Sequence, residues 1–263
     1  MTVLQGVSVL VTRPVHQAEN LSQLIEAAGG VAVKFPTIEI ARLSDSEAQP
    51  IATVNELTYD WLIFISANAV TMHGYYSDSD RIKKFKSVRI AAMGKSTELV
   101  LQKAGYVVDL VAKNGASTED LLAMPELLQV KNQRILIIRG QGGREELANV
   151  LQLRGASVDY LDVYKRIVPN IDNSNLIGLL KKHCLDIITI TSAEALQNLL
   201  SMVGESFKQH LLEVPLVVVS HRIRIIAAEI GFKRIAVAVS PSDMAILDTV
   251  IMSVKRGECG RSE

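Results

Sequence analysis

The chain has few cysteines, no excess of charge of either sign and no long apolar run. Its two cysteines, Cys184 and Cys259, form neither a CxxC motif nor a Cys/His ligand pattern, so we expect no zinc site and a reducing cytoplasm. Basic and acidic residues balance at 28 each, whereas a nucleic-acid-binding surface normally shows a basic excess or stripe. The sequence therefore predicts no metal and no nucleic-acid partner.

Signals for export, membrane insertion and assembly are also missing. The opening "MTVLQGVSVLVTRP" lacks the basic flank and apolar core of a signal peptide. Apolar runs are short and broken by charge, so none could span a bilayer. No coiled-coil pattern indicates assembly. We expect a cytoplasmic monomer without a membrane partner.

What the chain does contain is enough apolar sequence for a packed core. Hydrophobic residues make up 48% and charged residues 21%, which excludes a disordered chain. The 263 residues suit one large domain or two of ordinary size.

One short pattern occurs twice. "DWLIFISANAV" begins at Asp60 and "DIITITSAEAL" begins at Asp186, which is 126 residues later. The same offset places Arg13 on Arg139, and it carries "IAAMGKSTELVLQKAGY" onto "LVVVSHRIRIIAAEIGF". Several separated segments keep one register without a net insertion, so the sequence indicates an internal duplication.

Each copy alternates β-branched runs with helical patterns. Near-continuous apolar strands are typical of a parallel sheet that is covered on both faces. The expected helices stop at glycines suited to left-handed positions: Gly29, Gly105, Gly155 and Gly231. The fold class expected is α/β, with two doubly wound parallel-sheet domains from the duplication.

Two extended segments do not fit tight turns. "FPTIEIARL" (35–43) and "YLDVYKRIVP" (160–169) correspond at the 126-residue offset, and each contains a proline suited to a chain crossing. We expect them to pair as a two-stranded β linker that carries the chain between the domains.

Small, polar and basic residues follow the expected strands. Singly, each is better explained as an ordinary helix N-cap. Together they occupy the carboxyl edges of two parallel sheets, where ligands of such folds bind. If the domains face each other, these groups suit a large polycarboxylate or phosphate. The candidates are Arg13, Ser66, Ala67, Asn68, Gly94, Lys95, Ser96, Thr97, Thr191, Ser192, Ser220, His221 and Arg222.

A glycine-rich stretch gives the most specific local signal. In "RILIIRGQGGREEL" a strand ends at Arg139, and Gly140 and Gly142 precede a helix expected to begin near Arg144. Free amides at such a helix start can hold an anion. A tight strand-to-helix turn is the equally weighted alternative. The stretch is neither GxGxxG nor a P-loop.

Two side chains invite a catalytic interpretation. Tyr164 in "DVYKR" lies on the expected linker, and a phenol with an ordinary pKa of about 10 can deliver a proton. An aromatic ring that packs the crossing is the favoured alternative from the residues alone. His221 is more simply a helix-start residue than a base.

Taken together, these segments resemble the uroporphyrinogen-III synthase family from Val9 to about Val254. The resemblance rests on the order and spacing of "VLVTRP", "FPTIEI", "IFISANAV", "AAMGKST", "LIIRGQGGRE", "VYKR" and "ITITSAEAL". It implies two α/β domains that exchange segments, residues 1–38 with 168–256 and residues 41–165. Residues 257–263 are expected to form a disordered tail.

The resemblance also implies a reaction without metal or organic cofactor. Linear hydroxymethylbilane would lose its hydroxyl as water, invert its last pyrrole ring and close to uroporphyrinogen III. Tyr164 becomes the best candidate for assisting hydroxyl departure. Thr97, Ser66 and Ser192 match family positions near the substrate, and Ser66 and Ser192 are expected to face each other across a cleft. "SHRIR" departs from the Gly-x-Thr-Thr-like turn that is common in the family, so Arg222 is expected to supply a cation there in place of hydroxyl contacts.

Other functions stay open at this point. A two-domain α/β protein could be a non-catalytic module that binds a tetrapyrrole or another anion. A nucleotide- or phosphate-binding enzyme is disfavoured because a P-loop lysine and a strand-end acid at Rossmann spacing are missing.

The resemblance also makes a transient contact with the preceding enzyme of the pathway an expectation.

Overall fold

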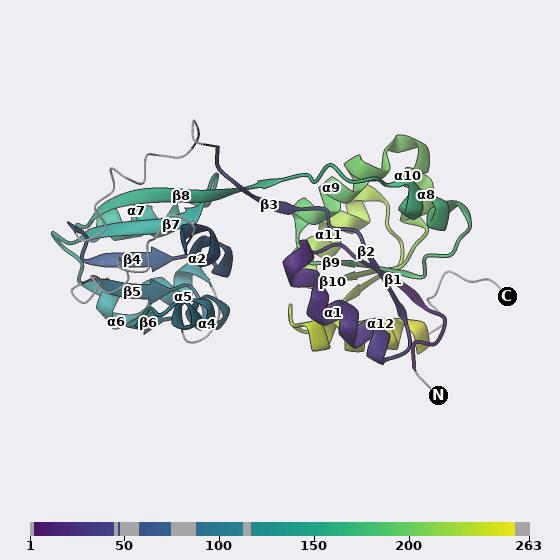
Figure 1. Ribbon diagram of the computed structural model, residues 1–263, viewed down its shortest axis with the longest axis horizontal. Coiled ribbons are helices and arrows are strands. Elements are labelled where there is room, and N and C mark those ends of the chain that lie inside the picture. The colour runs from purple at the N-terminus through teal and green to yellow at the C-terminus, as the bar shows by residue number, and fades with distance from the viewer. Residues whose placement is uncertain (1–2, 45–46, 48–57, 75–87, 113–116, 256–263) are drawn as a thin grey trace. The chain divides into compact units, whose positions relative to one another are not determined.

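The computed structural model divides into two compact units. It describes residues 3–44, 47, 58–74, 88–112 and 117–255. Unit 1 contains Met1–Glu39 and Ile167–Glu263, and unit 2 contains Ile40–Arg166 (Figure 1). We propose that these units are the two domains of the protein. The tail predicted to be disordered, 257–263, lies outside the described residues.

Unit 1 is built on a five-stranded sheet with the order β11-β10-β9-β1-β2. All of its neighbouring strand pairs are parallel. The strands are β1 (Ser8–Val11), β2 (Val31–Lys34), β9 (Ile187–Ile190), β10 (Leu216–Val218) and β11 (Ile235–Val237).

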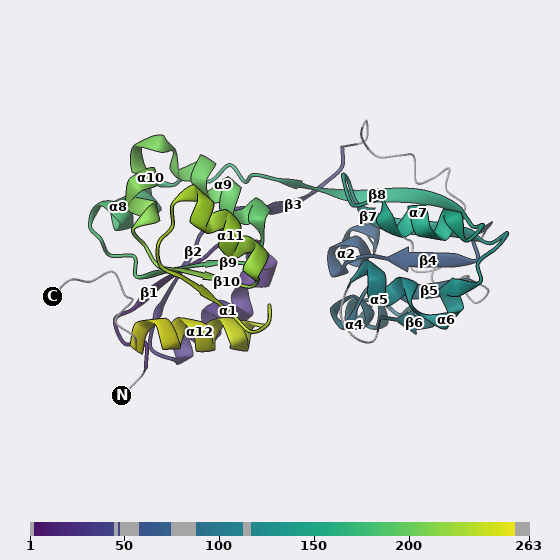
Figure 2. The ribbon, with the colours of Figure 1, turned by 180° about the vertical axis from the view of Figure 1, so that it is seen from behind.

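Helices cover both faces of this sheet, because side chains of a strand alternate between the faces and both are apolar (Figures 1 and 2). Val9 and Val11 pack with α1 (Val15–Ala27) and α12 (Asp243–Lys255). Leu10 packs in the opposite core. The helices of that core are α8 (Ser174–Lys181), α9 (Ala193–Val203), α10 (Glu205–Leu212) and α11 (His221–Ile230).

Unit 2 contains a six-stranded sheet with the order β3-β8-β7-β4-β5-β6. From β8 to β6 the neighbouring strands are parallel. The strands are β3 (Glu39–Arg42), β4 (Trp61–Phe64), β5 (Arg89–Ala92), β6 (Leu110–Val111), β7 (Arg134–Gly140) and β8 (Ser157–Ile167).

The two cores of unit 2 also lie on opposite faces of its sheet. Leu62 and Phe64 pack with α2 (Ala67–Gly74) and α4 (Lys95–Lys103). Trp61 belongs to the other core. The helices of that core are α5 (Thr118–Leu122), α6 (Pro125–Leu128) and α7 (Glu146–Leu153).

Strands β3 and β8 carry the chain from one unit to the other, and they pair as the sequence predicts. They are not a separate ribbon, however, because β8 also pairs with β7 and so extends the sheet of unit 2. The linker is therefore the outer part of a larger sheet.

The two sheets repeat one arrangement with different halves of the chain. Under the 126-residue shift, the β1–β2 pair Ser8–Val31 becomes the β7–β8 pair Arg134–Ser157. The registers of β1–β9, β9–β10 and β10–β11 likewise become those of β7–β4, β4–β5 and β5–β6. Strands β1 and β2 therefore complete a sheet of the second copy, and β7 and β8 complete a sheet of the first. This register confirms the duplication.

Four helices end at the glycines that the sequence predicts. Helices α1, α4, α7 and α11 are followed by the four predicted glycines, whose φ angles lie between 88° and 120°. That region is open to glycine and costly for other residues. Within the described ranges, no helix combines the length and apolar character needed to cross a membrane.

The repeated aspartates that begin "DWLIFIS" and "DIITITS" anchor the start of a neighbouring strand. Asp60 accepts a hydrogen bond from the Arg134 amide at 2.7 Å. Asp186 accepts one from the Ser8 amide at 2.8 Å and another from the Ser8 hydroxyl at 3.0 Å. Asp60 is exposed, whereas Asp186 is buried.

Replacing Asp186 with alanine should lower the free energy of unfolding by about 1–3 kcal/mol, because the buried amide of Ser8 loses its acceptor, whereas the Ser8 hydroxyl keeps the carbonyl of Cys184. Asp60→Ala is the matched control, since the same contact there is exposed to water. Urea unfolding of both variants checks this expectation. Equal losses in the two variants would contradict it.

Candidate functional site

The predicted site residues gather at the carboxyl edge of each sheet, one group in each unit. In unit 2, Ser66, Ala67 and Asn68 follow β4; Gly94, Lys95, Ser96 and Thr97 follow β5; Arg139 and Gly140 end β7, with Gly142 just beyond; and Tyr164 lies in β8. In unit 1, Arg13 follows β1; Thr191 and Ser192 follow β9; and Ser220, His221 and Arg222 follow β10.

Three of the serines are helix N-caps. Ser66 Oγ accepts from the Ala69 amide at 3.1 Å. Ser192 and Ser220 act in the same way on amides of α9 and α11, at 3.0 and 3.3 Å. Each hydroxyl keeps its own proton, because a serine has one donor and two acceptor positions. The N-cap interpretation and a ligand-binding role are therefore compatible.

Arg13 is held within unit 1. Its guanidinium donates to the Asp243 carboxylate and, at 2.8 Å, to the carbonyl of Pro241. Asn20 donates to the same carboxylate at 2.6 Å. These contacts tie the turn after β1 to the start of α12, so the positive charge of Arg13 already has a counter-ion.

Arg139, the counterpart of Arg13, is also occupied. Its Nε donates to Asp162 Oδ1 at 2.9 Å, and its guanidinium lies 3.6 Å from the centre of the Tyr160 ring. Burial raises the pKa of Tyr160 above its ordinary value, and the opposing charge of Arg139 does not cancel that effect. The sequence did not indicate Asp162 or Asp243, because each lies on an element that only the fold brings near its arginine.

The remaining basic residues among the candidates reach solvent. The Lys95 side chain is 73% exposed and pairs with Glu98 at 2.6 Å. His221 and Arg222 are exposed on the first turn of α11. Thr97, by contrast, lies in the first turn of α4 and is buried.

The glycine-rich turn differs from its prediction in one respect. Helix α7 begins at Glu146, two residues after the expected start, so the glycines do not lead straight into the helix. The Arg139 side chain closes the turn by donating from Nη1 to the carbonyl of Gly143 at 3.2 Å. Gly142 has a φ angle of +73°, which explains a glycine there without a ligand.

Gly140 leaves room for the ring of Tyr164. A Cβ atom on Gly140 would lie 2.5 Å from Cε2 of that ring, 2.6 Å from Cζ and 3.0 Å from the hydroxyl oxygen. The β7–β8 register shifts between Arg139 and Gly140, and the Gln141 amide donates to the Tyr164 carbonyl at 2.8 Å. The structure thus gives Gly140 a packing role that the sequence did not indicate.

Tyr164 is 1% exposed and belongs to the apolar core of unit 2. Its hydroxyl lies 3.2 Å from Ser66 Oγ, at the first turn of α2. The ring therefore packs as an ordinary core aromatic, while its polar atom is directed to the carboxyl edge of the sheet. The packing interpretation fits this geometry, and a catalytic role for Tyr164 stays a prediction.

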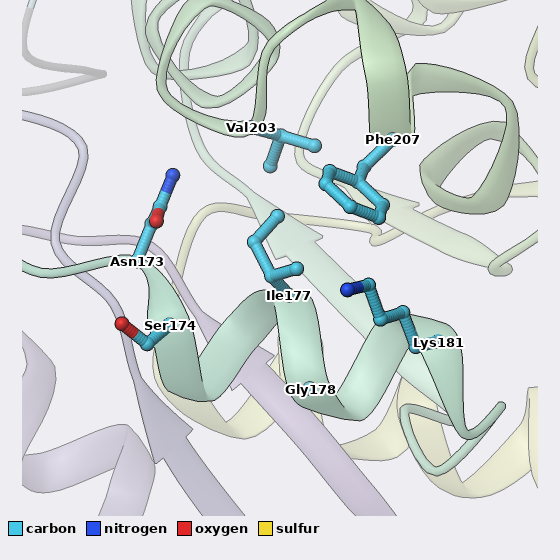
Figure 3. A pocket seen from close by; sticks show the side chains of 7 residues that line it. All are labelled: Asn173, Ser174, Ile177, Gly178, Lys181, Val203 and Phe207. Atoms are coloured by element: carbon cyan, nitrogen blue, oxygen red, sulfur yellow. The ribbon is translucent and has the colours of Figure 1, made fainter.

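Two pockets formed by described residues include neither Ser66 nor Tyr164. Figure 3 shows one of about 430 Å³ in unit 1, with Phe207, Ile177 and Lys181 around it and none of the predicted site residues. Another, of about 610 Å³, lies beside β6 in unit 2 and includes Lys95. Among the described residues, no group of His, Cys, Asp and Glu side chains is placed to hold a metal ion.

Comparisons with known proteins agree on one family. The family model described as "Uroporphyrinogen-III synthase HemD" matches residues 19–248. The chain is 32% identical to uroporphyrinogen-III synthase of Salmonella typhimurium and 31% identical to that of Escherichia coli, in each case over 91% of this chain and 98% of the relative.

Solved structures of the same enzyme share the fold. A mutant uroporphyrinogen III synthase of Thermus thermophilus has a TM-score of 0.62 and 17% identity, over 95% of this chain and 99% of that one. Uroporphyrinogen-III synthetase of Helicobacter pylori also has a TM-score of 0.62, with 16% identity over 94% of this chain and 99% of that one.

Proposed function

The chain belongs to the uroporphyrinogen-III synthase family, and we propose that Tyr164 supplies the proton on which its reaction depends. The reaction converts hydroxymethylbilane into uroporphyrinogen III, with loss of water and inversion of the last pyrrole ring. It is the cyclising hydro-lyase step of tetrapyrrole biosynthesis.

Departure of the hydroxyl group is the step that needs a proton. Hydroxide is a poor leaving group, whereas water leaves readily. The pyrrole nitrogen supplies the electrons that expel the group, and the product is an electrophilic azafulvene. A side chain that protonates the departing oxygen contributes about 10²–10⁴-fold to such a step.

One observation carries the assignment to Tyr164. Its hydroxyl lies beside Ser66 at the carboxyl edge of unit 2, and Gly140 leaves space for the ring to hold that position. Ligands of parallel α/β sheets bind at this edge. A phenol held there can supply a proton to a reaction at this edge without first reorienting.

The polycarboxylate substrate is bound by the other predicted residues at the carboxyl edges of the two sheets. Backbone amides at the starts of α2, α4, α9 and α11 attract carboxylates, because helix N-termini carry unsatisfied N–H groups and a partial positive charge. We propose as the binding set Arg13, Ser66, Ala67, Asn68, Gly94, Lys95, Ser96, Thr97, Arg139, Gly140, Gly142, Thr191, Ser192, Ser220, His221 and Arg222.

Ring inversion depends on the conformation in which the substrate is held. Ring closure must occur at the substituted carbon of the last pyrrole, which gives a spiro intermediate. Holding the two reacting carbons together is worth a large factor in rate, because an intramolecular reaction avoids the entropy cost of encounter. Without such guidance, spontaneous closure gives the symmetric type I isomer.

Product analysis tests the function. Purified protein is incubated with hydroxymethylbilane, and the cyclised isomers are oxidised and separated by chromatography. The expected product is type III, formed faster than the spontaneous reaction. Type I alone, at the spontaneous rate, would refute the assignment.

Two finer predictions from the sequence accompany this proposal. We propose a cytoplasmic location, in line with two cysteines that form no pairing or ligand pattern. We also propose a transient contact with the preceding enzyme of the pathway, which would pass on a reactive bilane. Co-purification of the two enzymes is the measurement that checks the contact.

A further inference from the structure

We propose that the proton of Tyr164 reaches the departing hydroxyl through Ser66, which makes Ser66 the group that touches the substrate. The inference rests on the proposed function, because it assumes that Tyr164 is the source of the proton. It changes the expected role of Ser66 from holding a carboxylate to completing a proton relay.

Burial is the first reason to place Ser66 between Tyr164 and the substrate. Tyr164 is 1% exposed, whereas Ser66 is half-buried, so the serine is the more accessible of the two hydroxyls. Their oxygens are 3.2 Å apart, and either one could donate. A phenol this deeply buried meets a ligand most directly through its exposed neighbour.

The direction of the hydrogen bond follows from counting donors and acceptors. Ser66 Oγ already accepts from the Ala69 amide at 3.1 Å, which leaves one acceptor position and one proton. A buried hydroxyl proton without an acceptor is costly, and Ser66 is the acceptor that the described structure provides for Tyr164. Tyr164 therefore donates to Ser66. The proton of Ser66 is then directed away from both the Ala69 amide and the Tyr164 hydroxyl.

The proton balance of the step is complete. Ser66 gives its proton to the hydroxyl oxygen of the substrate as the C–O bond breaks and its electron pair moves to that oxygen, which leaves as water. Tyr164 gives its proton to Ser66 in the same motion, so the serine is restored. The tyrosinate recovers a proton from the substrate, which loses one as the macrocycle closes.

The duplicated fold contains a natural comparison for this pair. Ser192 is the counterpart of Ser66 at the 126-residue offset, and it caps α9 with almost the same geometry. Ile38 stands where Tyr164 would be, and Pro14 stands where Gly140 would be. The scaffold is thus repeated, whereas the phenol and the glycine beside it occur in unit 2 alone. The relay accordingly belongs to unit 2.

A double-mutant cycle tests the relay, with kcat and KM measured for Ser66→Ala, Tyr164→Phe and the double variant. We expect Ser66→Ala to lower kcat by about 10²-fold or more with little change in KM. The double variant should be no slower than the slower single variant, because either change breaks the same relay. Ser66→Thr should restore most of the turnover, since it keeps both the hydroxyl and the cap.

Ser192→Ala is the matched control for the loss of a capping hydroxyl. Its effect on turnover should multiply with that of Tyr164→Phe, because Ser192 caps a helix of unit 1 and is not a member of the relay. Should Ser66→Ala unfold, Ser66→Gly carries the same expectation, since glycine is accepted at an N-cap.

The possible outcomes separate the relay from the proposed function. If Tyr164→Phe is slow but Ser66→Ala only raises KM, or if their losses multiply, the relay is wrong while Tyr164 keeps its role. If Tyr164→Phe turns over normally, the role proposed for Tyr164 is wrong, and the relay fails with it.

Discussion

Replacing Tyr164 with phenylalanine should lower kcat by about 10²–10⁴-fold and leave the fold intact. The change removes the hydroxyl next to Ser66 but keeps the ring that fills the apolar core of unit 2. The free energy of unfolding should fall by only about 0.5–1.5 kcal/mol, the net value of one hydrogen bond. Steady-state kinetics and urea unfolding measure the two quantities.

Tyr59→Phe is the control for this variant. Tyr59 belongs to the same core, and its hydroxyl donates to Asp159 at 2.9 Å. Burial raises the pKa of Tyr59 above its ordinary value, and Asp159 adds to that effect. Loss of the Tyr59 hydroxyl should lower the free energy of unfolding by a similar amount without slowing turnover. Equal turnover of the Tyr164 variant and the wild type would remove Tyr164 from the mechanism.

Replacing Gly140 with alanine should slow turnover by about 10²-fold and lower the free energy of unfolding by about 1–3 kcal/mol. The added Cβ would lie 2.5 Å from the Tyr164 ring, so the ring must move. A displaced ring takes its hydroxyl away from Ser66. The reacting geometry and the packing of the core are both disturbed.

Gly143→Ala provides the comparison for Gly140→Ala, since a Cβ at Gly143 meets its nearest atoms at an ordinary 3.4 Å. That variant should keep both its stability and its turnover. The measurements are kcat and thermal unfolding for the two variants. A stable Gly140→Ala variant with normal kcat would show that the position of the ring does not control the reaction.

The sequence was sufficient for the architecture because the relevant signals are local and repeated. Apolar strands, glycine helix stops and the 126-residue offset each need only short stretches of chain, and the structure has the predicted α/β fold with two matching sheets. The repeated serines also proved to be N-caps, as their position before a helix indicates.

The side-chain partnerships could not be obtained in this way. Arg13 pairs with Asp243 across most of the chain, and no local pattern links them. The contact between Gly140 and Tyr164 depends on a register shift where β7 meets β8, and strand patterns do not specify a bulge. The expectation that Ser66 and Ser192 face each other stays a prediction, because it concerns the placement of two units that are each described alone.

Hydroxyl departure depends on Tyr164 in this mechanism, whereas ring inversion depends on the shape in which the substrate is held. The most direct test is the isomer that the Tyr164→Phe variant forms from hydroxymethylbilane, with protein in excess so that the substrate stays bound. Slow formation of type III is expected. Type I as the main product would contradict it, because the phenol would then also be needed for inversion.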